Sequence, residues 1–194
     1  IQIGTGGEYE KLNSPHSESF KCKPKSIYNK SKFLSTKHLI RLYNTSEFPC
    51  TILRLYQTFG PYQDINRLIP IVIYNCLKNK KFPCSDGSQY RDFLYIDDFI
   101  NIIIKCIRSK KARGQIFNIG SGKPIKLKKI INYISLSIKK GKPLFGKIRL
   151  RPDEDLLTYP NIKKVQRILK WKPKISFEFG LKKTIKYFKK VDEK

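Results

Sequence analysis

The chain alternates short runs of apolar and β-branched residues with longer segments whose apolar residues recur at helical spacing. Runs of the first kind predict buried strands at residues 1–4, 51–56 and 115–119. Segments of the second kind predict helices at residues 28–45, 68–77, 99–107, 127–138, 162–169 and 180–188. Strands that alternate with helices in this way favour an α/β fold.

Several residues mark where these elements begin and end. Asp97 and Asp98 are good N-cap residues for the helix that follows them, and Pro70 fits only the first turn of its helix. Residues 82–89 carry no periodic pattern and predict an irregular segment. Residues 120–122 read Gly-Ser-Gly but lack the third glycine and the adjoining helix start of a dinucleotide-binding loop, so they predict a structural turn.

The composition indicates a folded protein without a membrane span. Hydrophobic residues make up 40% of the 194 residues, and no apolar run reaches the roughly 18 residues of a transmembrane helix. The first residues do not have the basic and apolar regions of a signal peptide. The five cysteines are irregularly spaced, and His16 and His38 are isolated, so we expect no metal site, no disulfide framework and a reducing, cytoplasmic location.

The strong positive charge has two interpretations. Forty-one basic residues against fifteen acidic ones give a formal net charge of +26, which would attract nucleic acid or another anionic surface. The basic residues are spread along the chain, however, and Lys exceeds Arg as it does in a composition biased toward Lys, Ile and Asn. We therefore favour compositional bias and do not expect a nucleic-acid partner.

Tyr28 and Lys32 form the pair most suggestive of chemistry. They lie four residues apart near the start of a predicted helix, so both side chains leave one face of it. A free tyrosine titrates near 10, and a lysine ammonium one turn away stabilises the phenolate and brings it closer to use as a base. The Y-x-x-x-K pattern alone occurs often by chance, and its surroundings decide its meaning.

Those surroundings resemble the extended short-chain dehydrogenases/reductases of the NAD-dependent epimerase/dehydratase family, which act on nucleotide sugars. The matching segments follow the family's order and spacing: Ile3-Gly-Thr5, Glu8-Tyr9, Tyr28-Asn-Lys-Ser-Lys32, the strand and turn at 53–61, Arg67-Leu-Ile-Pro70, residues 86–98, Phe117-Asn-Ile-Gly-Ser-Gly122, Arg151-Pro-Asp-Glu154, residues 169–173 and Gly180-Leu181. The resemblance covers essentially the whole chain.

The resemblance implies the C-terminal part of a Rossmann-type parallel sheet and a smaller α+β substrate-binding lobe. Residues 1–60 would be the C-terminal portion of the dinucleotide-binding domain with the catalytic helix. Residues 61–194 would mainly form the nucleotide-sugar lobe, with about 90–120 returning to the Rossmann sheet. A homodimer is also implied.

The resemblance also implies roles for individual residues. Thr5, Tyr28 and Lys32 would be catalytic, with Thr5 holding the reacting sugar oxygen, Tyr28 exchanging its proton and Lys32 lowering the Tyr28 pKa. The cofactor, NAD or NADP, would be bound by Tyr28, Lys32, Tyr56 and Thr58. The nucleotide-diphosphate sugar would be bound by Tyr9, Gln57, Arg67, Leu68, Arg91 and Arg151. Arginine suits the diphosphate because its planar fork bonds two phosphate oxygens.

The chain departs from the family pattern at Gly6 and Gly7. The family's 4,6-dehydratases carry an Asp-Glu pair there, which serves the elimination of water, and glycine transfers no proton. The sequence therefore favours an epimerase or a 4-ketoreductase that transfers hydride at the sugar ring. The alternatives are a relative of the 4,6-dehydratases and a non-catalytic basic module that binds nucleic acid. Glu10 and Gln57 also replace a usual glycine and asparagine.

The start of the chain bears on activity. The sequence begins with Ile and contains no Met, and Thr5 falls almost at its first residue. The family's glycine-rich strand-turn-helix for the cofactor pyrophosphate is therefore expected in a preceding segment. We expect these 194 residues alone to show no turnover and low stability.

Overall fold

The computed structural model describes residues 1–10 and 12–193, and its first layer is a three-stranded parallel sheet. The strands β1 (Gln2–Thr5), β2 (Thr51–Leu55) and β6 (Gln115–Ile119) lie in the order β1-β2-β6. Their register aligns Thr5 with Leu55 and Leu55 with Ile119, so all three carboxyl ends meet at one edge. In open parallel sheets this edge is where ligands bind.

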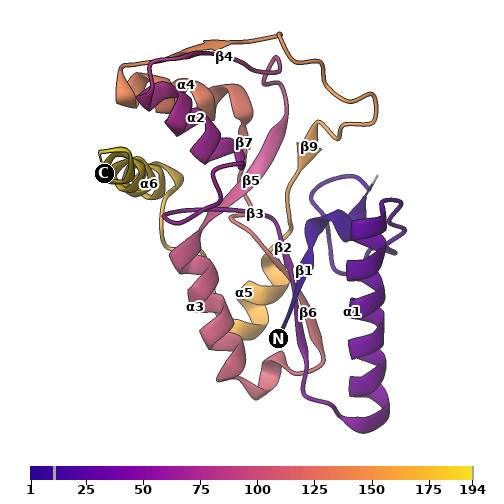
Figure 1. The fold of residues 1–194 in the computed structure, drawn as a ribbon. Helices are drawn as coiled ribbons and strands as arrows, with labels where there is room; N and C mark the ends of the chain where they lie inside the picture. Colours follow the sequence, from indigo (N-terminus) through magenta and orange to yellow (C-terminus); the bar gives the residue numbers. More distant parts are fainter. Residues whose placement is uncertain (11, 194) are drawn as a thin grey trace.

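Helices cover both faces of this sheet (Figure 1). Helix α1 (Ile27–Ser46) packs on one face, and α3 (Ile96–Ile107) and α5 (Lys163–Leu169) lie on the other, where they bury the apolar residues of β2 and β6. The 3-10 turns η1 (Gly6–Tyr9) and η2 (Lys110–Ala112) follow β1 and α3. Parallel strands buried by helices on both sides explain the nearly continuous apolar runs in the sequence.

The remaining elements form a second layer with its own core. Strands β3 (Gln57–Phe59), β7 (Pro124–Lys126) and β9 (Leu157–Thr158) all join the mixed sheet around β5 (Tyr90–Tyr95), and β4 (Lys81–Pro83) pairs with β8 (Lys142–Leu144). Helices α2 (Leu68–Leu77), α4 (Leu127–Ile138) and α6 (Phe177–Asp192) pack against them. Their contacts form a separate apolar cluster that includes Phe59, Ile73 and Ile134.

The structure confirms the predicted α/β fold with a parallel sheet, and most predicted elements lie within a few residues of their observed bounds. The N-cap prediction was wrong: Tyr95 is the N-cap of α3, and Asp97 and Asp98 lie in its first turn. Asp98 instead accepts hydrogen bonds from the backbone N–H groups of Lys174 and Ile175, which fixes the segment before α6. A short strand also begins the segment expected to be irregular.

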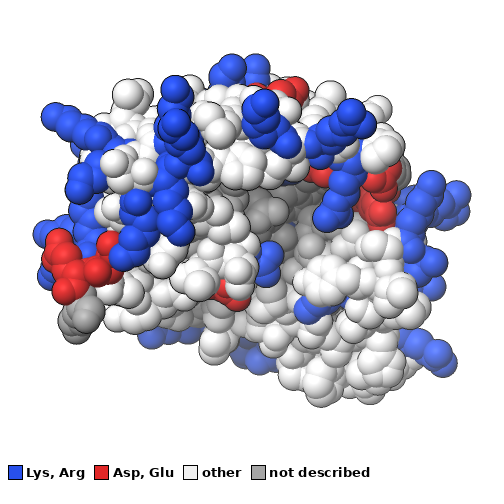
Figure 2. All heavy atoms as spheres, turned by 45° about the horizontal axis from the view of Figure 1, so that its top comes forward, with Lys and Arg blue, Asp and Glu red and all other residues white. Residues whose placement is uncertain are grey.

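The surface and the thiols complete this description. Figure 2 shows Lys and Arg side chains mainly along the upper part and the edges of the face in view, with Asp and Glu at only a few places. All five cysteines are buried free thiols. Among the described residues, no helix combines the length and apolar character that a bilayer span requires.

How the chain divides into the two proposed domains remains a prediction; β6 joins the first sheet, whereas β5 joins the second.

Candidate active site

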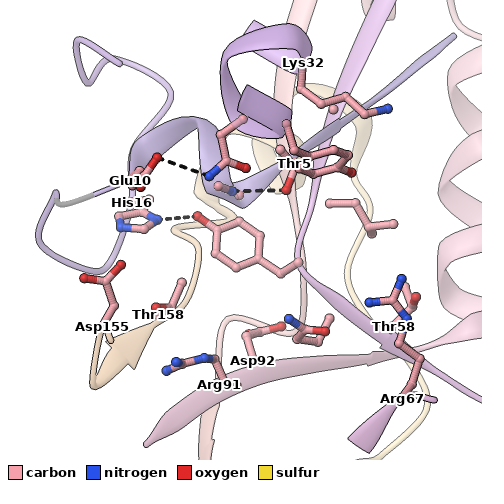
Figure 3. Close-up of a pocket in the computed structure, with 18 of the residues that line it drawn as sticks. Thr5, Glu10, His16, Lys32, Thr58, Arg67, Arg91, Asp92, Asp155 and Thr158 are labelled. Atoms are coloured by element: carbon pink, nitrogen blue, oxygen red, sulfur yellow. Dashed lines mark hydrogen bonds between the residues drawn. The ribbon is translucent and has the colours of Figure 1, made fainter. Parts of the chain in front are cut away.

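A cavity of about 850 Å³ lies at the carboxyl edge of the first sheet, between α1 and strand β5 (Figure 3). A volume of this size suits a ligand larger than a simple sugar. Nine of the residues predicted for the site line it: Thr5, Tyr28, Lys32, Tyr56, Gln57, Thr58, Arg67, Arg91 and Arg151. The fold thus gathers side chains that are up to 146 positions apart in the sequence, from 5 to 151.

Thr5 ends β1 and caps the 3-10 turn η1. Its Oγ1 accepts a hydrogen bond from Gly7 N at 3.1 Å, and Glu8 Oε1 accepts one from Thr5 N at 3.2 Å, which completes a capping box. A hydroxyl has one donor and two acceptor positions, so the bond from Gly7 leaves the Thr5 hydrogen for another acceptor. The turn therefore fixes the Thr5 side chain without using its proton.

Tyr28 and Lys32 lie in the first turns of α1, next to Thr5. Lys32 Nζ donates to the carbonyl of Ile3 at 3.0 Å and lies 5.8 Å from the centre of the Tyr28 ring. The Tyr28 side chain is 61% exposed and faces the cavity from the helix start. Both predicted side chains are thus held on one wall, with the ammonium group close to the phenol ring.

Glu10 explains how the start of α1 is positioned. Its Oε2 accepts hydrogen bonds from the N–H groups of Lys25 and Ser26 and from Asn29 Nδ2. A carboxylate at a helix N-terminus is favoured by the free N–H groups there. The departure from the family's glycine at this position therefore attaches the turn after β1 to the start of α1.

The opposite wall carries the arginines. Figure 3 shows Arg67 and Arg91 across the cavity from Thr5 and Lys32. Arg67 is the N-cap residue of α2, Arg91 lies on β5 and Arg151 lies in the loop before β9. Arg91 forms an ion pair with Glu154, a residue that also lines the cavity. One wall thus offers hydroxyl groups and an ammonium group, and the other offers guanidinium groups with carboxylates, such as Asp155, beside them.

Asp92, the residue after Arg91, stabilises a neighbouring turn. It is 1% exposed, and its carboxylate accepts hydrogen bonds from Ser121 N, Ser121 Oγ and Lys123 N. Burial raises the Asp92 pKa and these bonds oppose the rise. The turn at residues 120–122 is therefore bound to a carboxylate, which confirms the prediction of a structural turn rather than a phosphate loop.

Two predicted ligand-binding residues lie outside this cavity. Leu68 lines an adjoining cavity of about 190 Å³, together with Gln57 and Arg67. Tyr9 is completely buried: its hydroxyl donates to Asn118 Oδ1 at 2.8 Å and accepts from Arg54 Nη1 at 2.7 Å. The Tyr9 side chain thus belongs to the core beneath the site.

Glu8 and Arg54 complete that buried network. Arg54 Nε donates to Glu8 Oε2 at 2.9 Å, and both side chains are almost fully buried. Thr36 Oγ1 donates to the same carboxylate oxygen at 3.1 Å. A buried ion pair needs such extra hydrogen bonds to offset the loss of water. We refer to Glu8, Tyr9, Thr36, Arg54 and Asn118 as the buried network.

The sequence interpretation missed His16. It appeared isolated, yet it is 4% exposed, lines the cavity and has its Nδ1 only 2.6 Å from the hydroxyl of Tyr56 (Figure 3). Burial lowers the His16 pKa, and the nearby Asp155 carboxylate opposes the shift. No local signal indicates this pair, because 40 positions separate its members.

The resemblance implies that this cavity would receive one end of a nicotinamide cofactor. Lys32 and the hydroxyl of Tyr28 are donors suited to ribose oxygens, and Thr58 adds a further hydroxyl on the same cavity. NAD, when bound, accepts a hydride from a substrate carbon and returns it. The turn at 120–122 is not available for its pyrophosphate, because Asp92 already accepts hydrogen bonds from Ser121 N and Lys123 N.

The comparisons with known proteins agree with this geometry. Residues 1–120 match the family model described as "NAD dependent epimerase/dehydratase family". Over 174 residues the chain is 32% identical to dTDP-glucose 4,6-dehydratase 1 of Escherichia coli K12. The matched region covers 85% of this chain and 48% of that protein. The chain thus spans about half the length of the curated relatives it matches.

Solved structures give the same result. UDP-glucuronic acid 4-epimerase of Bacillus cereus, in complex with UDP-glucuronic acid and NAD, has a TM-score of 0.86 and 30% identity, over 97% of this chain and 60% of that one. UDP-glucose 4-epimerase of Thermotoga maritima, with UDP-glucose, has a TM-score of 0.89 and 25% identity, over 97% and 62%. The chain belongs to the NAD-dependent epimerase/dehydratase family, whose relatives bind nucleotide sugars.

Proposed function

We propose that this chain is the catalytic and substrate-binding part of an NAD(P)-dependent nucleotide-sugar epimerase or 4-ketoreductase. The observation that carries the proposal is the two-walled cavity. Thr5, Tyr28 and Lys32 lie on one wall and the guanidinium groups of Arg67 and Arg91 lie on the other. A nucleotide-diphosphate sugar has the matching division into hydroxyl groups and a dianionic diphosphate.

In this proposal each wall has its own task. Arg67, Arg91 and Arg151 bind the diphosphate, and Arg91 exchanges its present partner Glu154 for phosphate oxygens. Thr5 holds the reacting sugar oxygen, and Tyr28 takes or returns the proton of that oxygen. Lys32 keeps its ammonium group beside the Tyr28 ring, 5.8 Å from the ring centre.

Gly6 and Gly7 support epimerisation or reduction over elimination of water. A Cβ atom on Gly6 would lie 2.8 Å from Tyr56 Cζ, and one on Gly7 would overlap the amide of Asn29. The Asp-Glu pair of the related dehydratases would therefore require both neighbours to move. Identity to 4,6-dehydratases makes dehydration the second candidate.

The products of the reaction distinguish these activities. The full-length gene product containing these residues is incubated with NAD or NADPH and with UDP-glucose, UDP-glucuronic acid or dTDP-glucose. An epimerised product of unchanged mass supports an epimerase, and consumption of NADPH with a 4-keto sugar supports a reductase. A product lighter by one water would contradict the proposal and favour a dehydratase. The implied homodimer remains a prediction that sedimentation of the same protein tests.

A further inference from the structure

The Tyr56 phenol and the His16 imidazole form a hydrogen-bonded pair inside the cavity. Tyr56 directly follows β2, and its backbone N–H is bound to the Ile119 carbonyl at 3.0 Å. Its hydroxyl is 2.6 Å from His16 Nδ1, and both residues line the same cavity as Thr5 and Tyr28. The resemblance above assigns Tyr56 to cofactor binding and gives His16 no role, so neither the bond between them nor a contact of the Tyr56 hydroxyl with the substrate has been used so far.

The hydrogen-bond partners fix the direction of this bond. His16 Nε2 lies 2.9 Å from the carbonyl oxygen of Leu12, which only accepts, so Nε2 carries the imidazole hydrogen. Nδ1 is then an acceptor, and Tyr56 donates to it. The phenol oxygen keeps its lone pairs and is an acceptor toward anything else in the cavity.

Burial favours the neutral form of both groups. Burial raises the Tyr56 pKa, and the carboxylates of Asp92 and Glu18 add to the rise while Arg54 opposes it. Burial lowers the His16 pKa, with Asp155 opposing. A neutral phenol that already donates its hydrogen attracts a ligand donor and disfavours a ligand acceptor.

Gly6 places this phenol close to the substrate wall. The Tyr56 ring fills the space where a side chain at Gly6 would lie, since a Cβ there would be 2.8–2.9 Å from three ring carbons. Gly6 directly follows Thr5, which holds the reacting oxygen in the proposed function. The Tyr56 ring therefore occupies the space that a side chain at position 6 would need, at the same point of the cavity.

We propose that Tyr56 contacts the substrate as an acceptor for a sugar hydroxyl other than the one at Thr5 and Tyr28, and that His16 is the positioning residue that orients the Tyr56 phenol. This inference rests on the proposed function, because it requires a nucleotide sugar in the cavity. The cavity would then prefer nucleotide sugars whose ring carries a free hydroxyl within reach of the Tyr56 oxygen.

The test measures binding of a nucleotide sugar and of the same nucleotide without the sugar. Isothermal titration of the full-length gene product containing these residues uses UDP-glucose with UDP and dTDP-glucose with dTDP. Tyr56→Phe should weaken binding of the sugar-bearing ligand roughly three- to tenfold, the range of one lost hydrogen bond, and leave the free nucleotide unchanged. Tyr74→Phe removes the hydroxyl of an exposed tyrosine on α2, outside both cavities, and serves as the matched control; the ratio of the two dissociation constants should not change.

Two His16 variants separate orientation from packing. His16→Asn keeps an acceptor near the position of Nδ1 and should retain the preference for the sugar-bearing ligand, whereas His16→Leu should lose it. Equal binding of UDP-glucose by Tyr56→Phe and wild type, or an equal loss for both ligands, would overturn the inference. If the wild-type chain bound neither ligand, the nucleotide-sugar function would fail and the inference would fall with it.

Discussion

Two neighbouring polar clusters contain similar residue types, but one is buried in the core and the other lines the cavity. The buried network of Glu8, Tyr9, Thr36, Arg54 and Asn118 has its polar groups paired inside the protein. The cavity wall a few residues away presents Thr5 and Tyr28 with hydroxyl groups that a ligand can reach. The comparison indicates that availability, rather than residue type, separates the candidate catalytic tyrosine from the structural one.

The largest effect is expected from Tyr28→Phe, which removes the hydroxyl that the proposed function uses to exchange the substrate proton. The turnover number of the full-length gene product should fall by about 10²–10⁴, the contribution typical of general acid–base catalysis. Stability should change by less than about 0.5 kcal/mol, because the side chain is 61% exposed. Turnover is followed by product analysis and stability by urea unfolding; unchanged turnover would remove Tyr28 from the mechanism.

Breaking the buried network should affect stability instead. Arg54→Met leaves the Glu8 carboxylate buried without its ion-pair partner and should lower the free energy of unfolding by about 3–5 kcal/mol. Urea unfolding measures the loss, with Arg67→Met on the exposed cavity rim as the matched control. If Arg54→Met is too unstable to fold, Glu8→Gln combined with Arg54→Met should recover part of the stability. A loss no larger than that of Arg67→Met would mean that the network is not structural.

A pair of tyrosine variants sharpens the comparison. Tyr9→Phe leaves Asn118 Oδ1 and Arg54 Nη1 without a buried partner and should cost about 1–3 kcal/mol of unfolding free energy. Tyr56→Phe should cost less, because water in the cavity can bond His16 Nδ1 in place of the phenol. Thermal unfolding of both variants gives the order, and a reversed order would contradict the division into two clusters.

The smallest effect concerns pH. The His16 pKa is lowered in the folded chain, so below about 6.5 the unfolded chain binds more protons at this site than the folded one. The free energy of unfolding should therefore fall as pH drops through 6.5 and level off below the folded pKa. His16→Asn should show a shallower decrease between pH 7.5 and 5, measured by urea unfolding at each pH. Identical slopes would show that His16 is not buried in its neutral form.

Sequence reasoning succeeded where a pattern repeats locally. Three elements have the predicted bounds: the helices at Leu68–Leu77 and Leu127–Ile138 and the strand at Gln115–Ile119. Their buried faces follow from the spacing of apolar residues close together in the sequence. Motif residues at the carboxyl ends of parallel strands, such as Thr5 at the end of β1, also reached the cavity. Parallel strands bring those ends to one edge of the sheet.

It failed where the partner is distant in the chain. Asp98 looks like a helix cap, yet its carboxylate is used by Lys174 and Ile175, 76 and 77 positions later. Tyr9 looks like a substrate residue, yet Asn118 and Arg54 bury it in the core. Competition between a local role and a long-range hydrogen bond is decided by the tertiary fold, which local patterns do not contain.

A crystal structure of the chain with UDP-glucose or dTDP-glucose tests the central claim most directly, because the claim is about which wall holds which part of the ligand. The account predicts diphosphate oxygens bonded to Arg91 and Arg151, with the sugar ring between Thr5 and Tyr28. A ligand bound outside this cavity, or one with its sugar against the arginines, would contradict the account.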